Sequence, residues 1–392
     1  MIESKNESVE MKGMKTMNFP TKEIEKLCLE KPINFISSND RYSVLAREAD
    51  RTKTAYCFSI PICNDQTKKL VDLRFHHQGL SSVFIGSNSK ITIREAICLQ
   101  NAVGAVEISL PGVIIKKTED TLYFKTLNGI AEVTPTLNGL LFKMPSWGGV
   151  EPLSIKLKVD CAIYGIRSNK KCFAFMSEKF KPLVTVSCIG FFNREDTIVA
   201  PCEVEHKKIN EKEYSLVFTS KTTTEGYIAF EINMHELKLI QDTTVESLHP
   251  TVNNAFGGTA YLGNTRDFGE QWLYSRIDFS ILPQLLDKRI IRAVLHLPSL
   301  NESNGELIAH KISARFCSFG SNWKNKKVVA SPIHHTVSSN EYYHLDITDL
   351  IKDTKEKSYN FVIKAKTKDA EPVIVSTGDS YYKPQIFEVN FK

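Results

Sequence analysis

From residue 41 to its end, the chain is built from short runs in which apolar and polar residues alternate. Examples are KITIREAIC, AVEISL, YSLVFT, IIRAVLHL and QIFEVNF, which are rich in β-branched and aromatic residues. A period of two is typical of β-strands with one buried face. Turn residues recur about every 10 positions, which is the spacing of a sandwich or barrel. The pattern therefore predicts an all-β fold of tandem β-sandwich, jelly-roll-like domains.

One hairpin can be predicted in detail from the segment TLYFKTLNGIAEVTP, residues 121–135. Two alternating runs flank Asn128 and Gly129. Asn-Gly between such runs favours a tight turn, because both residues adopt positive φ angles at low cost. We therefore expect two antiparallel strands joined by a turn at Asn128 and Gly129.

The length of 392 residues predicts two or three domains, at about 100–200 residues per domain. The polar N-terminus is expected to form a flexible lead-in, with one short helix over residues 21–30. The segment MPSWGGVEP is dense in Pro and Gly and indicates a boundary near residue 150. We expect a lead-in at 1–40, a β domain at 41–150, a β-sandwich at 151–240 and another at 241–392.

Charge and cysteine content exclude several classes of protein. Lys plus Arg is 50 and Asp plus Glu is 45, so the net charge of +5 is too small for a dedicated nucleic-acid binder. The nine cysteines include no C-x-x-C pair, which argues against a structural zinc site. Free thiols packed as small hydrophobes are expected, and they favour a reducing compartment.

Targeting signals are also missing from the sequence. The N-terminus has no apolar core and no cleavage site, so we expect no secretory signal peptide. No apolar run reaches about 18 residues, so we expect no membrane span. Display on a cell surface or particle would then need lysis, a specialised secretion system or assembly into the particle.

Catalytic signatures do not occur either. The sequence contains no G-x-S-x-G, P-loop, H-E-x-x-H or dinucleotide-binding pattern. The pairs His76-His77 and His334-His335 lie in strand-like runs, where neighbouring residues point to opposite faces and cannot chelate one metal. We therefore expect a non-catalytic protein without a cofactor.

Calcium is the metal alternative. Asp346, Asp349 and Asp353 lie close together in the sequence, and calcium requires several converging oxygen ligands. Their spacing fits a solvated face or the start of a helix better than a calcium loop.

The three tryptophans are the candidate ligand-binding residues. Trp323 lies in a polar loop, and Trp147 is followed by two glycines. An exposed aromatic ring can stack on a sugar, but aromatic rings serve equally well to cover the end of a sandwich. Trp323 is the first candidate for a sugar contact, ahead of Trp272 and Trp147.

The segment YSRIDFSILP places Arg276 and Asp278 on one face of an expected strand, about 7 Å apart. A catalytic pair, a ligand clamp and a structural ion pair are the alternatives. The opposite face, which carries Ile277, Phe279 and Ile281, is expected to be buried. We interpret the pair as structural, with each charge bound to a neighbouring strand, and Phe279 as a marker of the core.

The C-terminal third contains several motifs in a specific order. DTTVESLHPTVNNAFGG is an Asp-led strand with an Asn-rich, Gly-containing loop, and TAYLGNT, YSRIDFSILPQL, IIRAVLHL, HLDITDLI and PQIFEVNF follow. Together they resemble the DNRLRE domain, a β-sandwich related to carbohydrate-binding modules, over residues 241–392. The resemblance implies a sandwich scaffold that includes Arg276 and Asp278. The family often carries two tryptophans and a Thr-Trp, where this chain has Asn322-Trp323.

Such domains often follow β-rich segments in bacterial surface, Rhs-type and wall-associated proteins. The segment VEISLPGVIIKKTEDTLYFKTLNGIAEVTPTLNGLLFKM is similar to those upstream segments. The first functional hypothesis is therefore a bacterial or phage protein that binds a glycan or cell-envelope polysaccharide in adhesion.

Two further hypotheses stay open. The chain is alternatively a structural subunit of an extracellular assembly, such as a phage tail, spore appendage or toxin-delivery particle. Sheet edges would then pair with copies of the chain or with a partner, giving a homo-oligomer or larger assembly. The third hypothesis is a polysaccharide-active enzyme whose acids are brought together by the fold.

Overall fold

The computed structural model describes most of the chain beyond residue 33. It covers residues 34–38, 43–49, 52–59, 62, 64, 66–67, 71–109, 112–146, 153–161, 163–178, 182–222, 224–234, 239–279, 285, 288–312, 316–327, 332–338, 341–351, 358–367 and 371–392. Within these residues the chain forms β-strands and one short helix, α2 (Thr348–Ile351). The predicted all-β sandwich fold is confirmed. The expected helix over residues 21–30 lies outside the described residues.

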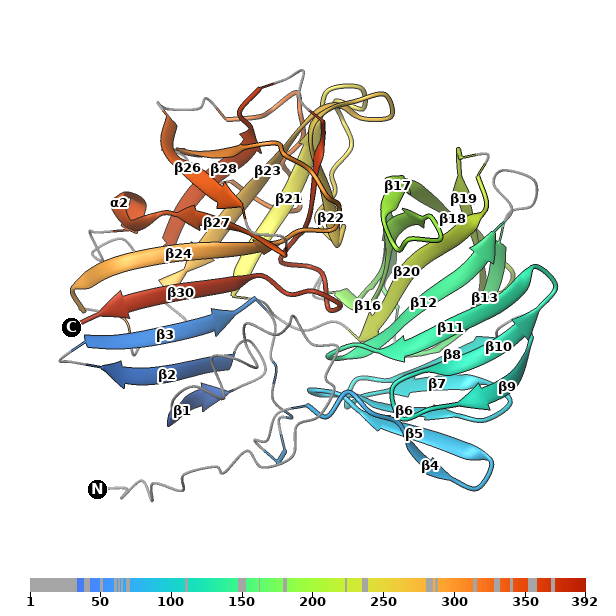
Figure 1. Cartoon of the computed structure of the whole chain (residues 1–392). Helices are drawn as coiled ribbons and strands as arrows, with labels where there is room; N and C mark the ends of the chain where they lie inside the picture. Colours follow the sequence, from blue (N-terminus) through green and yellow to red (C-terminus); the bar gives the residue numbers. More distant parts are fainter. Residues whose placement is uncertain are drawn as a thin grey trace.

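Two β-rich bodies lie side by side (Figure 1). One apolar core lies within the body built mainly from residues after 239, and the other lies mainly among residues 62–234 but also contains Tyr56, Phe58, Tyr342, Tyr381 and Ile386 of the first body. We call the body formed by β4–β20 the middle sandwich, because the terminal strands lie in the other body. We call that other body, formed by β1–β3 and β21–β30, the terminal sandwich.

The middle sandwich consists of two antiparallel sheets. In spatial order, the first contains β18 (Cys202–Lys208), β19 (Glu213–Ser220), β13 (Leu153–Asp160), β8 (Ala105–Ser109), β7 (Ile97–Gln100), β6 (Lys90–Ile93), β5 (Ser81–Ile85) and β4 (His76–Gln78). The second contains β14 (Gly165–Ser168), β15 (Cys172–Met176), β16 (Pro182–Phe192), β20 (Gly226–Met234), β12 (Gly139–Ser146), β11 (Gly129–Pro135), β10 (Leu122–Thr126) and β9 (Val113–Lys117), with β17 (Ile198–Ala200) beside β16.

Alternating apolar residues of both sheets meet in the core of the middle sandwich. Phe218 of β19 stacks on Phe230 of β20, with ring centroids 4.0 Å apart, and Phe142 stacks on Phe230 from the neighbouring strand at 4.9 Å. The strand pairs β12–β20 and β13–β8 both join segments from the two sides of residue 150. The boundary expected at residue 150 therefore falls within the middle sandwich.

The predicted hairpin forms between β10 and β11, with a turn one residue earlier than expected. Thr126 pairs with Gly129, so the connecting residues are Leu127 and Asn128. Gly129 has a φ of 133° and begins β11. Its positive φ is unfavourable for other residues, which explains the glycine at this position.

The terminal sandwich is one long sheet folded into two layers. Its order is β1 (Asn34–Ser38), β2 (Ser43–Ala49), β3 (Thr52–Phe58), β30 (Ile386–Phe391), β24 (Ile290–Pro298), β27 (Tyr342–Asp346), β26 (Pro332–Ser338), β25 (Leu307–Lys311), β28 (Ser358–Ala365), β23 (Gly269–Asp278), β22 (Thr259–Thr265) and β29 (Val373–Ser376), with β21 (Ile240–Glu246) paired to β23.

Strands from near both chain ends complete this sheet. β3 pairs antiparallel with β30 from Lys53↔Phe391 to Phe58↔Ile386. Figure 1 shows the blue strands β1–β3 beside the red β30. Ala55 and Cys57 of β3 are buried in the terminal core, so the N-terminal strands contribute to a body that is otherwise built from residues after 239.

The core of the terminal sandwich contains one face of β23 and the segment that follows. Leu273 and Ile277 are fully buried, and Phe279 is 1% exposed. The Phe279 ring lies edge-on against Phe387 of β30, with centroids 5.7 Å apart. Because side chains alternate along a strand, Trp272, Tyr274 and Arg276 face the opposite side.

Candidate functional site

Trp272 and Trp323 lie together on the outer face of the terminal sandwich. Their ring centroids are 5.0 Å apart at an interplanar angle of 56°, and both side chains are half-buried. Trp272 lies on β23, and Trp323 lies in the segment 316–327, which we call the covering loop. The structure thus brings together two of the three candidate tryptophans. Trp147 lies outside the described residues.

The covering loop is anchored to the sheet below it. Phe316 is buried and packs against Tyr274 of β23, with ring centroids 5.8 Å apart. The Tyr274 hydroxyl donates a hydrogen bond to the carbonyl of Lys327, at 3.3 Å. Both contacts hold the covering loop beside Trp272 and so fix the position of Trp323.

Each indole of the pair also has a charged neighbour. The Lys326 ammonium lies 4.1 Å from the centroid of Trp323, and the Lys364 ammonium lies 4.9 Å from the centroid of Trp272. These are cation–π distances. The Trp272 indole nitrogen donates to the Glu270 carboxylate at 2.9 Å, which fixes its ring orientation. A ligand that reaches the tryptophan pair therefore meets apolar rings with two lysine ammonium groups and the Glu270 carboxylate beside them.

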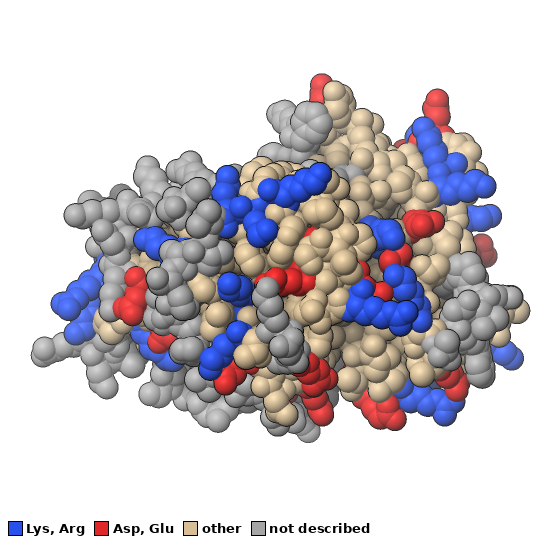
Figure 2. All heavy atoms as spheres, turned by 90° about the horizontal axis from the view of Figure 1, so that it is seen from above, with Lys and Arg blue, Asp and Glu red and all other residues tan. Residues whose placement is uncertain are grey.

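Charges of both signs are distributed over the molecular face seen from above. Figure 2 shows Lys and Arg side chains interspersed with Asp and Glu over the described part of this face. No broad field of one sign is visible there.

Arg276 and Asp278 follow Tyr274 along the same outer face of β23. The guanidinium of Arg276 lies 3.1 Å from the carboxylate of Asp278, and the two side chains are 22% and 19% exposed. We expected each charge to bind a neighbouring strand, but Arg276 forms its ion pair along its own strand. The reason is geometric, since residues i and i+2 of a strand share one face.

A buried ion pair joins the two sandwiches near this site. Lys171 directly precedes β15 in the middle sandwich, and its ammonium lies 2.6 Å from the carboxylate of Glu246, the last residue of β21 in the terminal sandwich. The ammonium also lies 3.5 Å from the centroid of Phe268. Burial lowers the pKa of Lys171, and the charge and hydrogen bond of Glu246 oppose that change.

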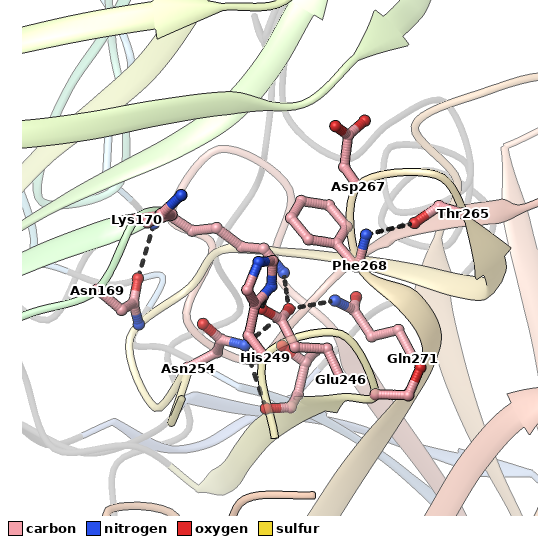
Figure 3. Close-up of polar contacts among 12 residues, drawn as sticks. Asn169, Lys170, Glu246, His249, Asn254, Thr265, Asp267, Phe268 and Gln271 are labelled. Atoms are coloured by element: carbon pink, nitrogen blue, oxygen red, sulfur yellow. Dashed lines mark hydrogen bonds and ion pairs between the residues drawn. The ribbon is translucent and has the colours of Figure 1, made fainter. Parts of the chain in front are cut away.

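The Glu246 carboxylate is hydrogen-bonded on both oxygens. One oxygen also accepts from the amides of Gln271, at 3.0 Å, and Asn254, at 3.2 Å. The other oxygen lies 2.8 Å from Nδ1 of His249. Figure 3 shows these side chains directed at Glu246 from the surrounding segments. A buried charge is tolerated when it is paired and hydrogen-bonded in this way.

A second buried carboxylate also joins the two sandwiches, but it belongs to the middle sandwich. Glu231 of β20, in the middle sandwich, accepts hydrogen bonds from the Ser380 hydroxyl, the Tyr381 amide and the Tyr382 amide of the terminal sandwich, at 2.9–3.2 Å. Burial raises the pKa of Glu231, although these bonds and one from Asn233 favour the charged form. Each sandwich therefore supplies one buried carboxylate to groups of the other.

Apolar contacts accompany these polar ones. Ile189, Phe192 and Ala229 of the middle sandwich pack with Tyr261, Phe268 and Ile374 of the terminal sandwich in one cluster. The contact region that contains this cluster, Lys171–Glu246 and Glu231 is called the joint below. The joint could not be predicted from the sequence, because its members are far apart in the chain and no local pattern marks them.

The acidic residues around α2 are the positions considered for calcium. Asp346 accepts hydrogen bonds from the amide and hydroxyl of Thr348, so it caps the start of α2. Asp353 lies outside the described residues. Among the residues that the structure describes, no group of three or more His, Cys, Asp or Glu is arranged to hold a metal ion. The expectation of no cofactor, with calcium as the alternative, stays a prediction.

No family model matches the chain, and no curated protein matches it. The resemblance of residues 241–392 to the DNRLRE domain therefore stays a prediction. In the described part of the chain, no helix has the length and apolar character needed to cross a membrane.

Proposed function

We propose that this chain is a non-catalytic β-sandwich protein that binds a surface glycan at the Trp272–Trp323 pair. The observation that supports the proposal is the position of the two indoles, 5.0 Å apart, on a strand and an anchored loop. Aromatic rings cover the apolar C–H face of a sugar, while nearby polar groups bond its hydroxyls. A supported pair also loses little entropy on binding.

The neighbouring charges favour one class of glycan. The ammonium groups of Lys326 and Lys364 lie beside the two rings, and Lys326 is exposed. A carboxylated or phosphorylated polysaccharide would gain charge-assisted contacts with the exposed Lys326, which a neutral polysaccharide lacks. Binding should then weaken as salt rises, because exposed charges are screened.

Affinity electrophoresis through a panel of neutral and anionic polysaccharides tests the proposal. Trp323→Ala and Trp272→Ala should each weaken binding about tenfold, as expected for aromatic anchors in the centre of a site. Tyr164→Ala is the matched control, because Tyr164 is 62% exposed and lies on the middle sandwich. Binding that is unchanged in both tryptophan variants, or absent from the whole panel, would exclude this function.

Self-association is the second candidate function, and the edge of the middle sandwich favours it. β9 is the last strand of its sheet. Val113 of β9 is 71% exposed, and Ile130 of β11, two strands away in the same sheet, is 51% exposed. An uncovered apolar edge can pair with another strand. Light scattering after size exclusion should then show a mass that rises with concentration, and Val113→Lys should abolish the rise. A monomer at all concentrations would rule this candidate out.

A further inference from the structure

The segment between β21 and β22, residues 247–258, lies against the covering loop, and we call it the linking loop. The side-chain amide of Asn253 donates to the carbonyls of Ser318 and Ser321, both at 2.6 Å. The carbonyl of Pro250 accepts from the backbone amide of Lys324, at 3.0 Å. Lys324 directly follows Trp323, so the linking loop fixes the backbone on both sides of that tryptophan.

The same linking loop is bound to the middle sandwich. The side-chain amide of Asn169, in the turn before β15, donates to the backbone carbonyl of Asn253 at 2.8 Å. Asn169 also accepts from the backbone amides of Lys171 and Cys172, at 2.7 and 2.8 Å, which fixes its orientation. Asn253 is therefore bonded to the middle sandwich through its carbonyl and to the covering loop through its side chain.

Two further contacts hold the linking loop in this position. Phe256 is 4% exposed and packs with Cys172, Ala174 and Met176 of β15. On its other side, the Phe256 ring lies 5.3 Å from the ring of Phe319 in the covering loop. Glu246 binds His249 and Asn254, two residues of the linking loop (Figure 3). The same carboxylate also binds Lys171 of the middle sandwich.

We infer that the middle sandwich positions Trp323 through the contact of Asn169 with Asn253. The geometry of the tryptophan pair then depends on both sandwiches, although both tryptophans belong to the terminal sandwich. Asn169 and Asn253 are positioning residues, since they hold the covering loop and do not touch the rings. The positioning of Trp323 is independent of the proposed function. Only the effect on ligand binding rests on the proposal that the tryptophan pair binds a glycan. By linkage, a ligand that orders the tryptophan pair should also strengthen the joint.

Asn169→Asp is the sharpest test. The variant keeps the oxygen that accepts from Lys171 and Cys172, and it replaces the amide donor by an oxygen that repels the Asn253 carbonyl. Asn193→Asp is the matched control, because Asn193 makes the same kind of turn with Glu195 and Thr197 within the middle sandwich. Both are made in a Trp147→Phe background, so that tryptophan fluorescence, excited where tyrosine does not absorb, reports Trp272 and Trp323 alone.

The expected result is a changed tryptophan spectrum in Asn169→Asp and an unchanged spectrum in Asn193→Asp, with equal far-ultraviolet spectra. Met176→Ala is an independent variant, because it removes apolar support behind Phe256 without altering the turn. It should produce the same type of spectral change. Wild-type spectra in both Asn169→Asp and Met176→Ala would overturn the inference.

Ligand binding provides the second readout. With any polysaccharide that the wild type binds, Asn169→Asp should bind about fivefold more weakly, which is the effect of one lost hydrogen bond. Unchanged affinity in Asn169→Asp would also count against the inference. If the wild type binds none of the polysaccharides, the proposed function fails, while the spectral comparison still decides whether the middle sandwich positions the tryptophans.

Discussion

The ammonium of Lys171 and the carboxylate of Glu246 lie 2.6 Å apart, although they belong to different sandwiches. Their side chains are only 6% and 3% exposed. A buried ion pair contributes little net stability, because desolvation offsets the attraction, but the loss of one partner leaves an unpaired charge in the interior. The pair therefore favours the one relative orientation of the two sandwiches in which both charges are paired.

Lys171→Met should destabilise the protein by about 3–5 kcal/mol, because it leaves the Glu246 carboxylate buried without its cation. Urea unfolding followed by circular dichroism measures the change in the free energy of unfolding. Lys212→Met is the control, since Lys212 pairs with Asp160 at 3.0 Å on the surface. That pair should contribute less than about 1 kcal/mol.

The double variant Lys171→Met/Glu246→Gln separates lost charge from lost packing. It should be more stable than Lys171→Met alone, because no unpaired charge remains buried. A single variant as stable as the wild type would show that the ion pair does not hold the joint.

Phe279→Ala should destabilise the terminal sandwich by about 3–5 kcal/mol through the cavity that it leaves. Phe279 is 1% exposed and packs against Tyr359 and Phe387. Arg276→Ala should cost much less, since its ion pair with Asp278 is partly exposed. Equal unfolding midpoints for Phe279→Ala and the wild type would refute the role of Phe279 in the core.

Local patterns in the sequence carry much of this fold. The alternation in β23 separates Ile277 from Arg276, and Asn128-Gly129 marks the β10–β11 hairpin within one residue. Long-range relationships could not be predicted in the same way. The pairing of β3 with β30 joins opposite ends of the chain, and no periodicity specifies which distant strands are neighbours.

The candidate site was only partly predictable for the same reason. Trp272 and Trp323 could be named as aromatic candidates, but their contact depends on how the covering loop folds over β23. The joint left no signal in the sequence, because Lys171 and Glu246 each look like ordinary charged residues of a strand end. Burial and pairing, which distinguish them, are properties of the assembled fold.

Ionisation of Glu388 should make the free energy of unfolding depend on pH. Burial raises its pKa, but the hydrogen bond from His296, at 3.0 Å, and the charges of His296 and Arg292 overcome this and hold the pKa below its ordinary value. The folded state then binds fewer protons than the unfolded state. The stabilisation is present above the unfolded pKa of about 4.3 and is lost as the pH falls through the folded value.

Urea unfolding of Glu388→Gln between pH 3 and 7 measures this contribution. The variant should lose stability relative to the wild type at neutral pH, and the two should converge in acid. Glu107→Gln, at an exposed position of β8, is the control and should follow the wild type throughout. A constant difference between Glu388→Gln and the wild type at every pH would contradict the assignment.

The free cysteines should react at very different rates in the folded protein. Cys317 is exposed, whereas Cys57, Cys172, Cys188 and Cys202 are buried. Burial raises the pKa of the Cys172 thiol to about 12, and the thiolate is the reactive form. Brief treatment with iodoacetamide should therefore label Cys317 before these four buried cysteines, as measured by peptide mass spectrometry. The urea-unfolded chain, in which all nine cysteines should be labelled, is the control. Labelling of Cys172 as fast as that of Cys317 in the native protein would show that β15 is not buried against the linking loop.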